Sequence, residues 1–217
     1  MKTTSLIAAM LAAAAAHVSA TGIGVNVGTT GLGADYGFDI IPTFSGRVGI
    51  SGFDYNHDVN KTNVSYHGRA KLQDLRLLLD WSPLGPFRVT GGVYGAHNRF
   101  DLTGQPTSGT YTINGDAYRA SDIGYINGQI KQAHSIAPYV GVGYGSVAGA
   151  GINFYADFGA FFQGASASVN ASCAASSSTC NSSRLAQDVA AEQRHLQDSV
   201  SSFKAWPVAS IGITVGF

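Results

Sequence analysis

Six charged side chains lie inside segments of the sequence that are otherwise apolar or small, and both signs occur equally often. Asp74, Arg76 and Asp80 illustrate the pattern, because they occupy even positions while leucine or tryptophan occupies the odd positions beside them. Successive side chains of a β-strand point to opposite faces, so charges at this spacing share a face and can pair there. Such a cluster could be a network of ion pairs, a ligand site or the lining of a pore. The six candidates are Arg47, Asp74, Arg76, Asp80, Arg88 and Asp157.

A histidine followed by a serine, His134-Ser135, is a second candidate for chemistry. Nucleophilic catalysis requires a base within hydrogen-bond reach of the hydroxyl and a third group that orients the base. Adjacent residues of a strand point to opposite faces, and no Asp or Glu lies between Asp122 and Asp157. We therefore predict no catalytic residue.

Cofactor and metal sites are not predicted either. The histidines at 57, 67, 97 and 195 show no metal-ligand spacing, and the glycine-rich run 141–151 lacks the lysine and helix start of a phosphate-binding loop. The formal net charge is zero and the pI is about 7.0, which gives no electrostatic argument for nucleic acid as a partner.

Cys173 and Cys180 are the only cysteines and lie close together in a stretch rich in serine and alanine. Two thiolates without a nearby histidine or further cysteine cannot complete a tetrahedral metal shell. In an exported protein such a pair is more often a disulfide. We predict a disulfide that staples this segment.

Residues 1–20 have the features of an export signal. Lys2 is the only charge, an apolar stretch runs from Leu6 to Ala16, and Val18-Ser19-Ala20 fits a small-residue cleavage site. A retained membrane helix would need about 20 apolar residues, and this run is shorter. We expect a signal peptide at 1–20, followed by one domain at 21–217.

The end of the chain alternates strictly between apolar residues and small or polar ones. Ile211, Ile213, Val215 and the final Phe217 share one face, opposite Ser210, Gly212, Thr214 and Gly216. A period of two is typical of a strand with an apolar medium on one side. Similar alternation predicts strands in segments near 64–81, 87–102, 138–145 and 152–163, with a bulge near Gln73. Two shorter strands in 21–40 and one over 47–55 bring the total to eight, although a single strand over 21–40 would also fit the pattern.

Composition indicates the medium that these strands face. Charged residues make up only 12% of the chain, whereas 11% are aromatic and 28 of 217 residues are glycine; soluble domains average about 25% charged. A β-structure can cross a membrane only as a closed barrel, because lipid cannot satisfy free backbone groups. We expect an all-β, antiparallel transmembrane barrel. An outward Arg at the midplane would cost about 2–4 kcal/mol, which places the six charges in the lumen.

Short links at 40–45, 82–86 and 146–151 alternate with long ones at 56–63, 103–135 and 168–204. Short turns on one side and long loops on the other are the asymmetry of outer-membrane barrels. The last long link contains an amphipathic helix, predicted over 184–203 and capped by Ser182 or Ser183. We interpret it as a lid over the barrel rim rather than as a partner-binding helix.

The whole mature chain resembles small bacterial outer-membrane barrels of the OmpA, OmpX and OmpW type. Segments 31–37 (GLGADYG), 137–145 (APYVGVGYG) and 206–213 (WPVASIGI) resemble uncharacterised proteobacterial outer-membrane proteins in particular. The resemblance implies that Ile211, Ile213, Val215 and Phe217 form the C-terminal signal that the barrel-assembly machinery reads. It also suggests a comparison of His134-Ser135 with lipid A deacylase barrels, which the missing acid argues against.

Three functions remain open from the sequence. The first, which we prefer, is a non-enzymatic barrel in the outer membrane, with lipid and lipopolysaccharide around it, a charge-paired closed lumen and outer loops that meet an extracellular partner. The second is a channel for small solutes or hydrophobic molecules, which requires the lumen to open. The third is a lipid A-modifying enzyme.

Overall fold

The computed structural model describes residues 20–61, 64–106, 108–173 and 182–217. The predicted signal peptide lies outside the described residues, except for Ala20. Within these ranges the structure is mostly strand, and none of the helices is both long and apolar enough to cross a membrane.

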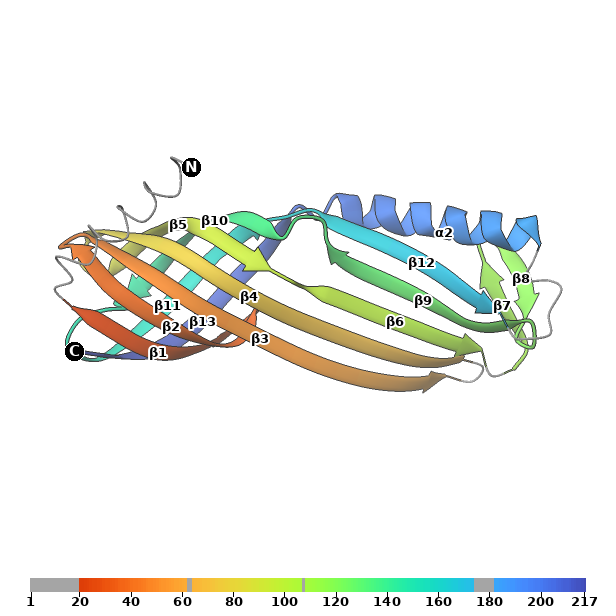
Figure 1. Cartoon of the computed structure of the whole chain (residues 1–217), viewed down its shortest axis with the longest axis horizontal. Coiled ribbons are helices and arrows are strands. Elements are labelled where there is room, and N and C mark those ends of the chain that lie inside the picture. Colours follow the sequence, from red (N-terminus) through yellow and green to blue (C-terminus); the bar gives the residue numbers. More distant parts are fainter. Residues whose placement is uncertain (1–19, 62–63, 107, 174–181) are drawn as a thin grey trace, which may run out of the picture.

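Eight strands close into an antiparallel ring, which confirms the predicted fold class (Figure 1). Around the ring they follow the order β4-β3-β2-β1-β13-β11-β10-β5, and pairing between β4 and β5 closes it. Residues 21–41 form two strands joined by the turn at Thr29-Thr30, as preferred. The eight strands are β1 (Thr21–Gly28), β2 (Gly31–Ile41), β3 (Phe44–Lys61), β4 (Val64–Leu84), β5 (Phe87–Ala96), β10 (Ile136–Gly145), β11 (Gly151–Phe162) and β13 (Ala205–Gly216).

The strands β3 and β4 continue beyond the ring, where three further strands extend the same sheet (Figure 1). We call this part, with β6 (Arg99–Pro106), β9 (Ile123–Gln132) and β12 (Ala165–Cys173), the extension sheet. A hairpin of β7 (Thr110–Ile113) and β8 (Asp116–Arg119) lies at its far tip, and α2 (Ser183–Ser201) runs along β12. The expectation of long loops over most of 56–63 and 103–135 is therefore wrong.

Two further expectations about these strands are corrected. The segment expected as one strand over 87–102 divides at His97-Asn98, where β5 ends in the barrel and β6 begins in the extension sheet. No bulge occurs near Gln73, because β4 keeps an unbroken register with β3 from Val64 to Trp81. The change of pattern there reflects a change of neighbour: β4 pairs with β6 up to Lys71 and with β5 from Asp74 onward.

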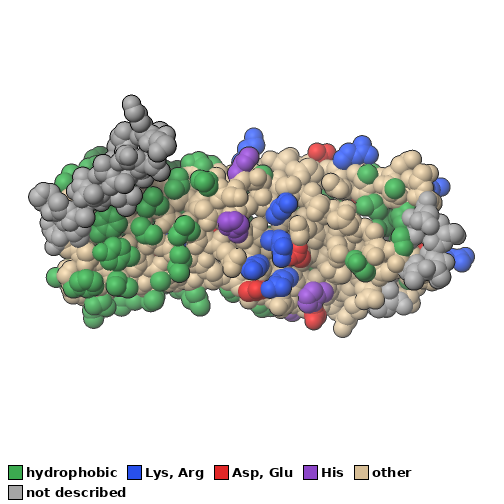
Figure 2. All heavy atoms as spheres, viewed as in Figure 1, with side chains coloured by type: hydrophobic (Ala, Val, Ile, Leu, Met, Phe, Trp, Pro, Cys, Tyr) green, Lys and Arg blue, Asp and Glu red, His purple; other side chains and the backbone are tan. Residues whose placement is uncertain are grey.

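Side chains of the ring alternate between an apolar exterior and a buried lumen. Along β4, Leu75 and Leu77 are 55% and 56% exposed, whereas Arg76 and Leu78 are each 4% exposed. Figure 2 shows hydrophobic side chains covering the barrel end of the molecule on the face in view. In water so large an apolar surface would be unfavourable, so its continuity indicates a lipid environment.

Three short links, between β2 and β3, β4 and β5, and β10 and β11, lie with the chain end at one end of the ring. The link between β4 and β5 contains Gly85 with φ +56°, and that between β10 and β11 contains Gly149 with φ +110°; glycine adopts such values without strain. Phe217 at the chain end lies at the same end of the barrel (Figure 1). We call this the turn end and the opposite one the extension end.

Candidate functional site

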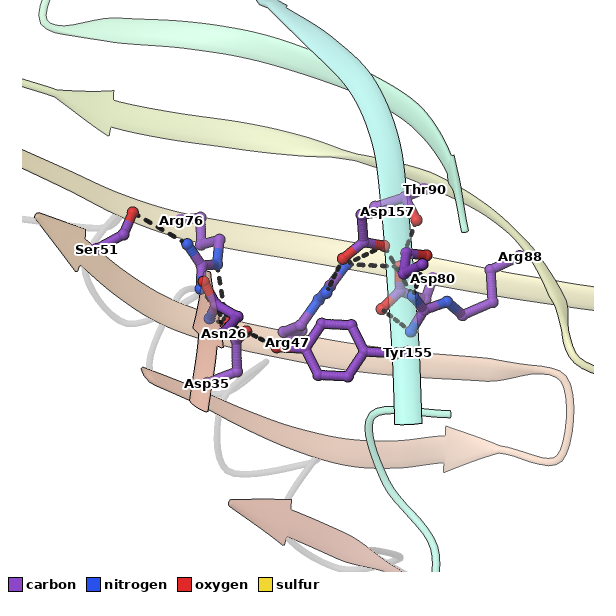
Figure 3. Close-up of polar contacts among 11 residues, drawn as sticks. Asn26, Asp35, Arg47, Ser51, Arg76, Asp80, Arg88, Thr90, Tyr155 and Asp157 are labelled. Atoms are coloured by element: carbon purple, nitrogen blue, oxygen red, sulfur yellow. Dashed lines mark hydrogen bonds and ion pairs between the residues drawn. The ribbon is translucent and has the colours of Figure 1, made fainter. Parts of the chain in front are cut away.

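Four charged side chains from four strands form an alternating cluster in the lumen (Figure 3). We call Arg47, Asp80, Arg88 and Asp157 the quartet; they lie on β3, β4, β5 and β11. Each arginine meets both carboxylates. Arg47 Nη1 lies 2.5 Å from Asp157 Oδ2, and its Nη2 lies 3.4 Å from Asp80 Oδ1. Arg88 Nη2 lies 2.7 Å from Asp157 Oδ1, and its Nη1 lies 3.9 Å from Asp80 Oδ2.

The quartet is almost completely shielded from solvent. Its members are between 0% and 7% exposed, and their formal charges sum to zero. Thr90 adds a hydrogen bond of 2.5 Å from its hydroxyl to Asp80 Oδ1. Gly143 leaves room for the cluster, since a Cβ there would lie 2.6 Å from Arg88 Nη2 and 2.8 Å from Asp157 Oδ1. Charges are buried in proteins when they are paired, as these are.

A second cluster centres on Asp35, which the sequence argument did not select. Arg76 Nε donates to Asp35 Oδ1 at 2.8 Å, and Asn26 Nδ2 donates to Oδ2 at 2.7 Å. Arg76 also donates to Ser51 Oγ at 3.2 Å. Asp35 lies between the outward-facing residues Ala34 and Tyr36 of β2. The alternation of faces that selected Asp80 would therefore also have selected Asp35.

Tyr155 connects the two clusters (Figure 3). Its hydroxyl donates to Asp35, and its ring lies 5.4 Å from Arg47 Cζ and 5.6 Å from Arg88 Cζ. Guanidinium groups at this distance from an aromatic ring are attracted to it. Tyr155 therefore contacts charges of both clusters, and Arg47, Arg76, Asp80, Arg88 and Asp157 belong to one polar layer across the lumen.

Asp74, the sixth predicted residue, stands apart from that layer. It is 5% exposed, and its Oδ1 accepts a hydrogen bond of 3.3 Å from Asn98 Nδ2. In the described part of the chain, its Oδ2 is buried without a hydrogen-bond partner. Asp74 thus faces the interior, as predicted, but its polar partner is an amide at the junction of barrel and extension sheet.

Aromatic rings fill the lumen toward the extension end, and we call Tyr94, Tyr139, Phe161 and Trp206 the aromatic plug. The Tyr94 ring centroid lies 4.7 Å from that of Phe161 and 5.1 Å from that of Tyr139. Trp206 stacks on Phe161 at 6.2 Å. Phe161 is 0% exposed, although it interrupts the alternation of its strand in the sequence. The interruption is thus an inward aromatic ring in a layer that the sequence argument missed.

The remaining candidates for chemistry do not come together. His134 and Ser135 are exposed between β9 and β10, and no side-chain hydrogen bond joins them within the described ranges. Among the described residues, no group of three or more His, Cys, Asp and Glu could hold a metal ion. Cys173 ends β12, whereas Cys180 lies outside the described residues, so their disulfide stays a prediction.

The predicted helix is confirmed with bounds Ser183–Ser201, and Ser182 is its N-cap. Its expected place over the barrel rim is wrong, because α2 packs along β12 and reaches the β7–β8 hairpin. Arg184 Nη2 lies 2.7 Å from Asp116 Oδ1 in that hairpin, and Asp188 accepts hydrogen bonds from Tyr118 and Asn114. The apolar face of the helix packs against the extension sheet, because the lumen of the barrel is already filled by side chains and leaves no apolar surface for it.

The anchor at Asp188 predicts how docking of α2 depends on pH. Hydrogen bonds from Tyr118 and Asn114 hold the pKa of Asp188 below its usual value of 3.8, and burial raises the pKa of Tyr118 to about 12. A carboxyl whose pKa is lower in the folded state stabilises that state above its unfolded pKa and loses this effect as pH falls through the folded value. We expect protection of α2 amides from hydrogen exchange, corrected for intrinsic rates, to hold at neutral pH and to fall only below 3.8.

A matched pair of variants checks this pH dependence. Asp188→Asn should weaken protection of α2 at neutral pH, whereas Asp198→Asn, at an exposed position of the same helix, should leave it unchanged. Protection that is lost already between pH 7 and pH 5, far above the carboxyl pKa, would show that another group controls docking.

The terminal strand β13 presents its predicted residues outward. Ile211, Val215 and Phe217 are 64%, 57% and 73% exposed, and Ile213 is 36% exposed. Phe217 exchanges two backbone hydrogen bonds with Thr21, of 3.0 and 3.1 Å, so that the start of β1 lies beside the residue that follows β13. Recognition of this strand by the assembly machinery stays a prediction.

Comparisons with known proteins bear on the fold. No protein-family model matches the chain, and no curated protein matches it in sequence. The crystal structure of CarO from Acinetobacter baumannii matches with a TM-score of 0.61 and 23% identity, over 90% of this chain and 97% of that one. CarO2 from the same organism matches with a TM-score of 0.59 and 20% identity, over 93% and 100%. The chain has the fold of an outer-membrane β-barrel whose ring contains eight strands.

Proposed function

We propose that the protein is an integral outer-membrane barrel, exported by a cleaved signal peptide, which acts without catalysis through its extension sheet. The observation that carries the proposal is the filled lumen, in which the quartet and the aromatic plug occupy successive layers. A finer relation to OmpA-, OmpX- or OmpW-type barrels belongs to this proposal.

Location in the outer membrane is supported by the exterior of the ring. Exposed apolar side chains occur on every strand of the barrel, as with Val25, Ile50, Leu77 and Phe154. Bacterial outer-membrane barrels have short turns on the periplasmic side and longer segments outside. By that rule the turn end faces the periplasm and the extension sheet projects outside the cell.

Closure of the lumen is supported by the dimensions of an eight-stranded ring. Such a ring has an interior just wide enough for side chains to fill. Here Arg47 and Phe161, two of the largest side chains inside, are 1% and 0% exposed. Ions would have to cross a layer of paired charges and then a layer of stacked rings.

Contact with an extracellular partner is supported by the face of the extension sheet that α2 covers only in part. On this face Phe53, Tyr55 and Leu102 remain 46%, 52% and 52% exposed. The rings of Phe53 and Tyr55 stack at 6.0 Å, and Tyr55 stacks in turn on His57. Exposed aromatic clusters of this kind are typical of surfaces that meet another molecule.

Planar-bilayer recording tests the closed lumen. We expect the wild-type protein to give no stable conductance steps, because charge pairs and rings fill the interior. The double variant Arg47→Ala/Asp157→Ala keeps the lumen neutral and removes two side chains of the quartet, so it should conduct more often than wild type. Stable wild-type steps whose size changes when Arg47, Arg76 or Arg88 is neutralised would overturn the proposal.

A solute channel is the second candidate function. A space of about 680 Å³ lies near the extension end of the ring. Its lining includes the inward-facing Ser51 and Asp74, but most of it is outward-facing, as with Leu32, Ile50 and Leu75, so the space opens on the outer wall of the ring. If this space were the entrance of a conducting path, the same recording would show steps in the wild-type protein.

A further inference from the structure

Three basic residues stand side by side on the outward face of the extension sheet. In the register of the sheet, Lys71 of β4 is the partner of Arg99 of β6, and Arg99 is the partner of Lys131 of β9. We call Lys71, Arg99 and Lys131 the basic row. Figure 2 shows Lys and Arg side chains gathered beside the hydrophobic part of the barrel on the face in view.

Neighbouring acidic groups neutralise the row only in part. Arg99 Nε lies 2.9 Å from Asp101 Oδ2, and the nearby Arg69 lies 2.6 Å from Asp54. Asp54 is the partner of Lys71 in the register of β3 and β4, but its carboxylate pairs with Arg69. Within the ranges that the structure describes, neither Lys71 nor Lys131 takes part in a direct ion pair. Like charges directly opposite each other destabilise a sheet. An anion bound across the three strands would relieve this repulsion.

The row lies just beyond the apolar exterior of the barrel. Along β4 the outward positions run from Trp81 through Leu79, Leu77 and Leu75, all at least 45% exposed, to Gln73 and then Lys71. Four residues of strand span about 13 Å, or about 10 Å along the membrane normal at a tilt of about 40°. That distance places the row level with lipid headgroups rather than hydrocarbon.

We propose that the basic row binds phosphate groups of lipopolysaccharide in the outer leaflet, an inference that rests on the proposed location. Adjacent strands are about 4.8 Å apart, so the row spans about 10 Å and can meet two phosphate groups. The guanidinium of Arg99 offers paired donors to phosphate oxygens, and the lysines act as mobile point charges on either side. The row thereby holds lipopolysaccharide against one face of the extension sheet, where this sheet leaves the barrel.

Binding of purified lipopolysaccharide to the refolded barrel in detergent micelles tests this. We expect the wild-type protein to prefer lipopolysaccharide over the same lipid after enzymatic removal of its phosphates. Lys71→Gln/Lys131→Gln should lose about tenfold or more in affinity for the phosphorylated form, because each lysine near an anionic surface contributes to attraction. Neither substitution leaves a carboxylate without an ion-pair partner, so the loss of affinity reports on the lysines themselves.

The control removes two exposed cations elsewhere, in Arg119→Gln/Arg194→Gln, and should bind like wild type. Equal affinity for phosphorylated and dephosphorylated lipid, or an equal loss in the control, would overturn the proposal. Inorganic phosphate bound as tightly as the lipid would also overturn it, because the site would then take a free anion. Failure of the proposed location has a different signature, namely a protein that stays soluble without detergent and migrates identically on gels whether boiled or not.

Discussion

Replacing Asp157 with alanine is expected to lower the free energy of unfolding of the barrel by about 3–5 kcal/mol, because removing one member of a buried ion pair leaves the other charge buried and unpaired. Asp157 meets both arginines of the quartet, at 2.5 and 2.7 Å, so two guanidinium groups lose their nearest anion at once. Asp80 cannot replace it, since its contacts to Arg47 and Arg88 are longer, at 3.4 and 3.9 Å. Urea titration in lipid vesicles, read as the folded fraction on unboiled gels, measures the change.

Asp101→Ala provides the matched control. Asp101 also accepts from an arginine, Arg99, but the two side chains are 47% and 29% exposed. Exposed ion pairs contribute about 0–1 kcal/mol. Equal losses of stability in the two variants would mean that water reaches the quartet and that the lumen is open there.

Leu77→Arg is expected to lower stability by about 2–4 kcal/mol in a lipid bilayer, which is the cost of an outward arginine near the midplane of a barrel. Leu77 is 56% exposed and lies midway along the outward apolar residues of β4. In a water-soluble protein the same change at an exposed position would stay within about 0.5 kcal/mol. The variant therefore distinguishes lipid from water as the medium around the ring.

Tyr125→Arg is the companion substitution. Tyr125 is 44% exposed and belongs to β9 of the extension sheet, which lies beyond the apolar zone. We expect unfolding midpoints in vesicles to fall for Leu77→Arg and to stay unchanged for Tyr125→Arg. A neutral Leu77→Arg would contradict the membrane-embedded ring.

The barrel strands could be predicted from sequence because lipid imposes a strict rule on them. Every second residue between Leu75 and Trp81 must be apolar, and the strand is recognised by that constraint alone. The strands β6, β9 and β12 obey no such rule. One of their faces lies outside the apolar zone, where serine, threonine, asparagine and glycine are as acceptable as apolar residues. Their sequences therefore resemble loops, and the sheet is revealed only by the successive pairing of β6 with β4, β9 with β6 and β12 with β9.

The candidate site was predictable to the same depth. The alternation of side chains along each strand placed Arg47, Asp80, Arg88 and Asp157 inside the ring. Which of these charges pair with one another depends on how the strands are staggered around the ring, and alternation does not give that. Arg47 and Asp157, for example, are 110 positions apart in sequence. Asp35 was not selected, although the alternation of Ala34 and Tyr36 turns it inward just as the alternation of Ala156 and Phe158 turns Asp157 inward. Asp74 was grouped with the others because its distance from them along the barrel is not encoded in alternation.

The unbroken β3–β4 ladder also has a mechanical meaning. It runs for all 18 residues of β3, from the turn end of the ring to Lys61 in the extension sheet, and its register is unbroken where the ring gives way to the extension sheet. A force along β3 and β4 would load these hydrogen bonds in shear, because the two strands would have to slide past each other. The extension sheet should therefore move rigidly with the barrel wall, so that a force applied to this sheet is transmitted directly to the ring.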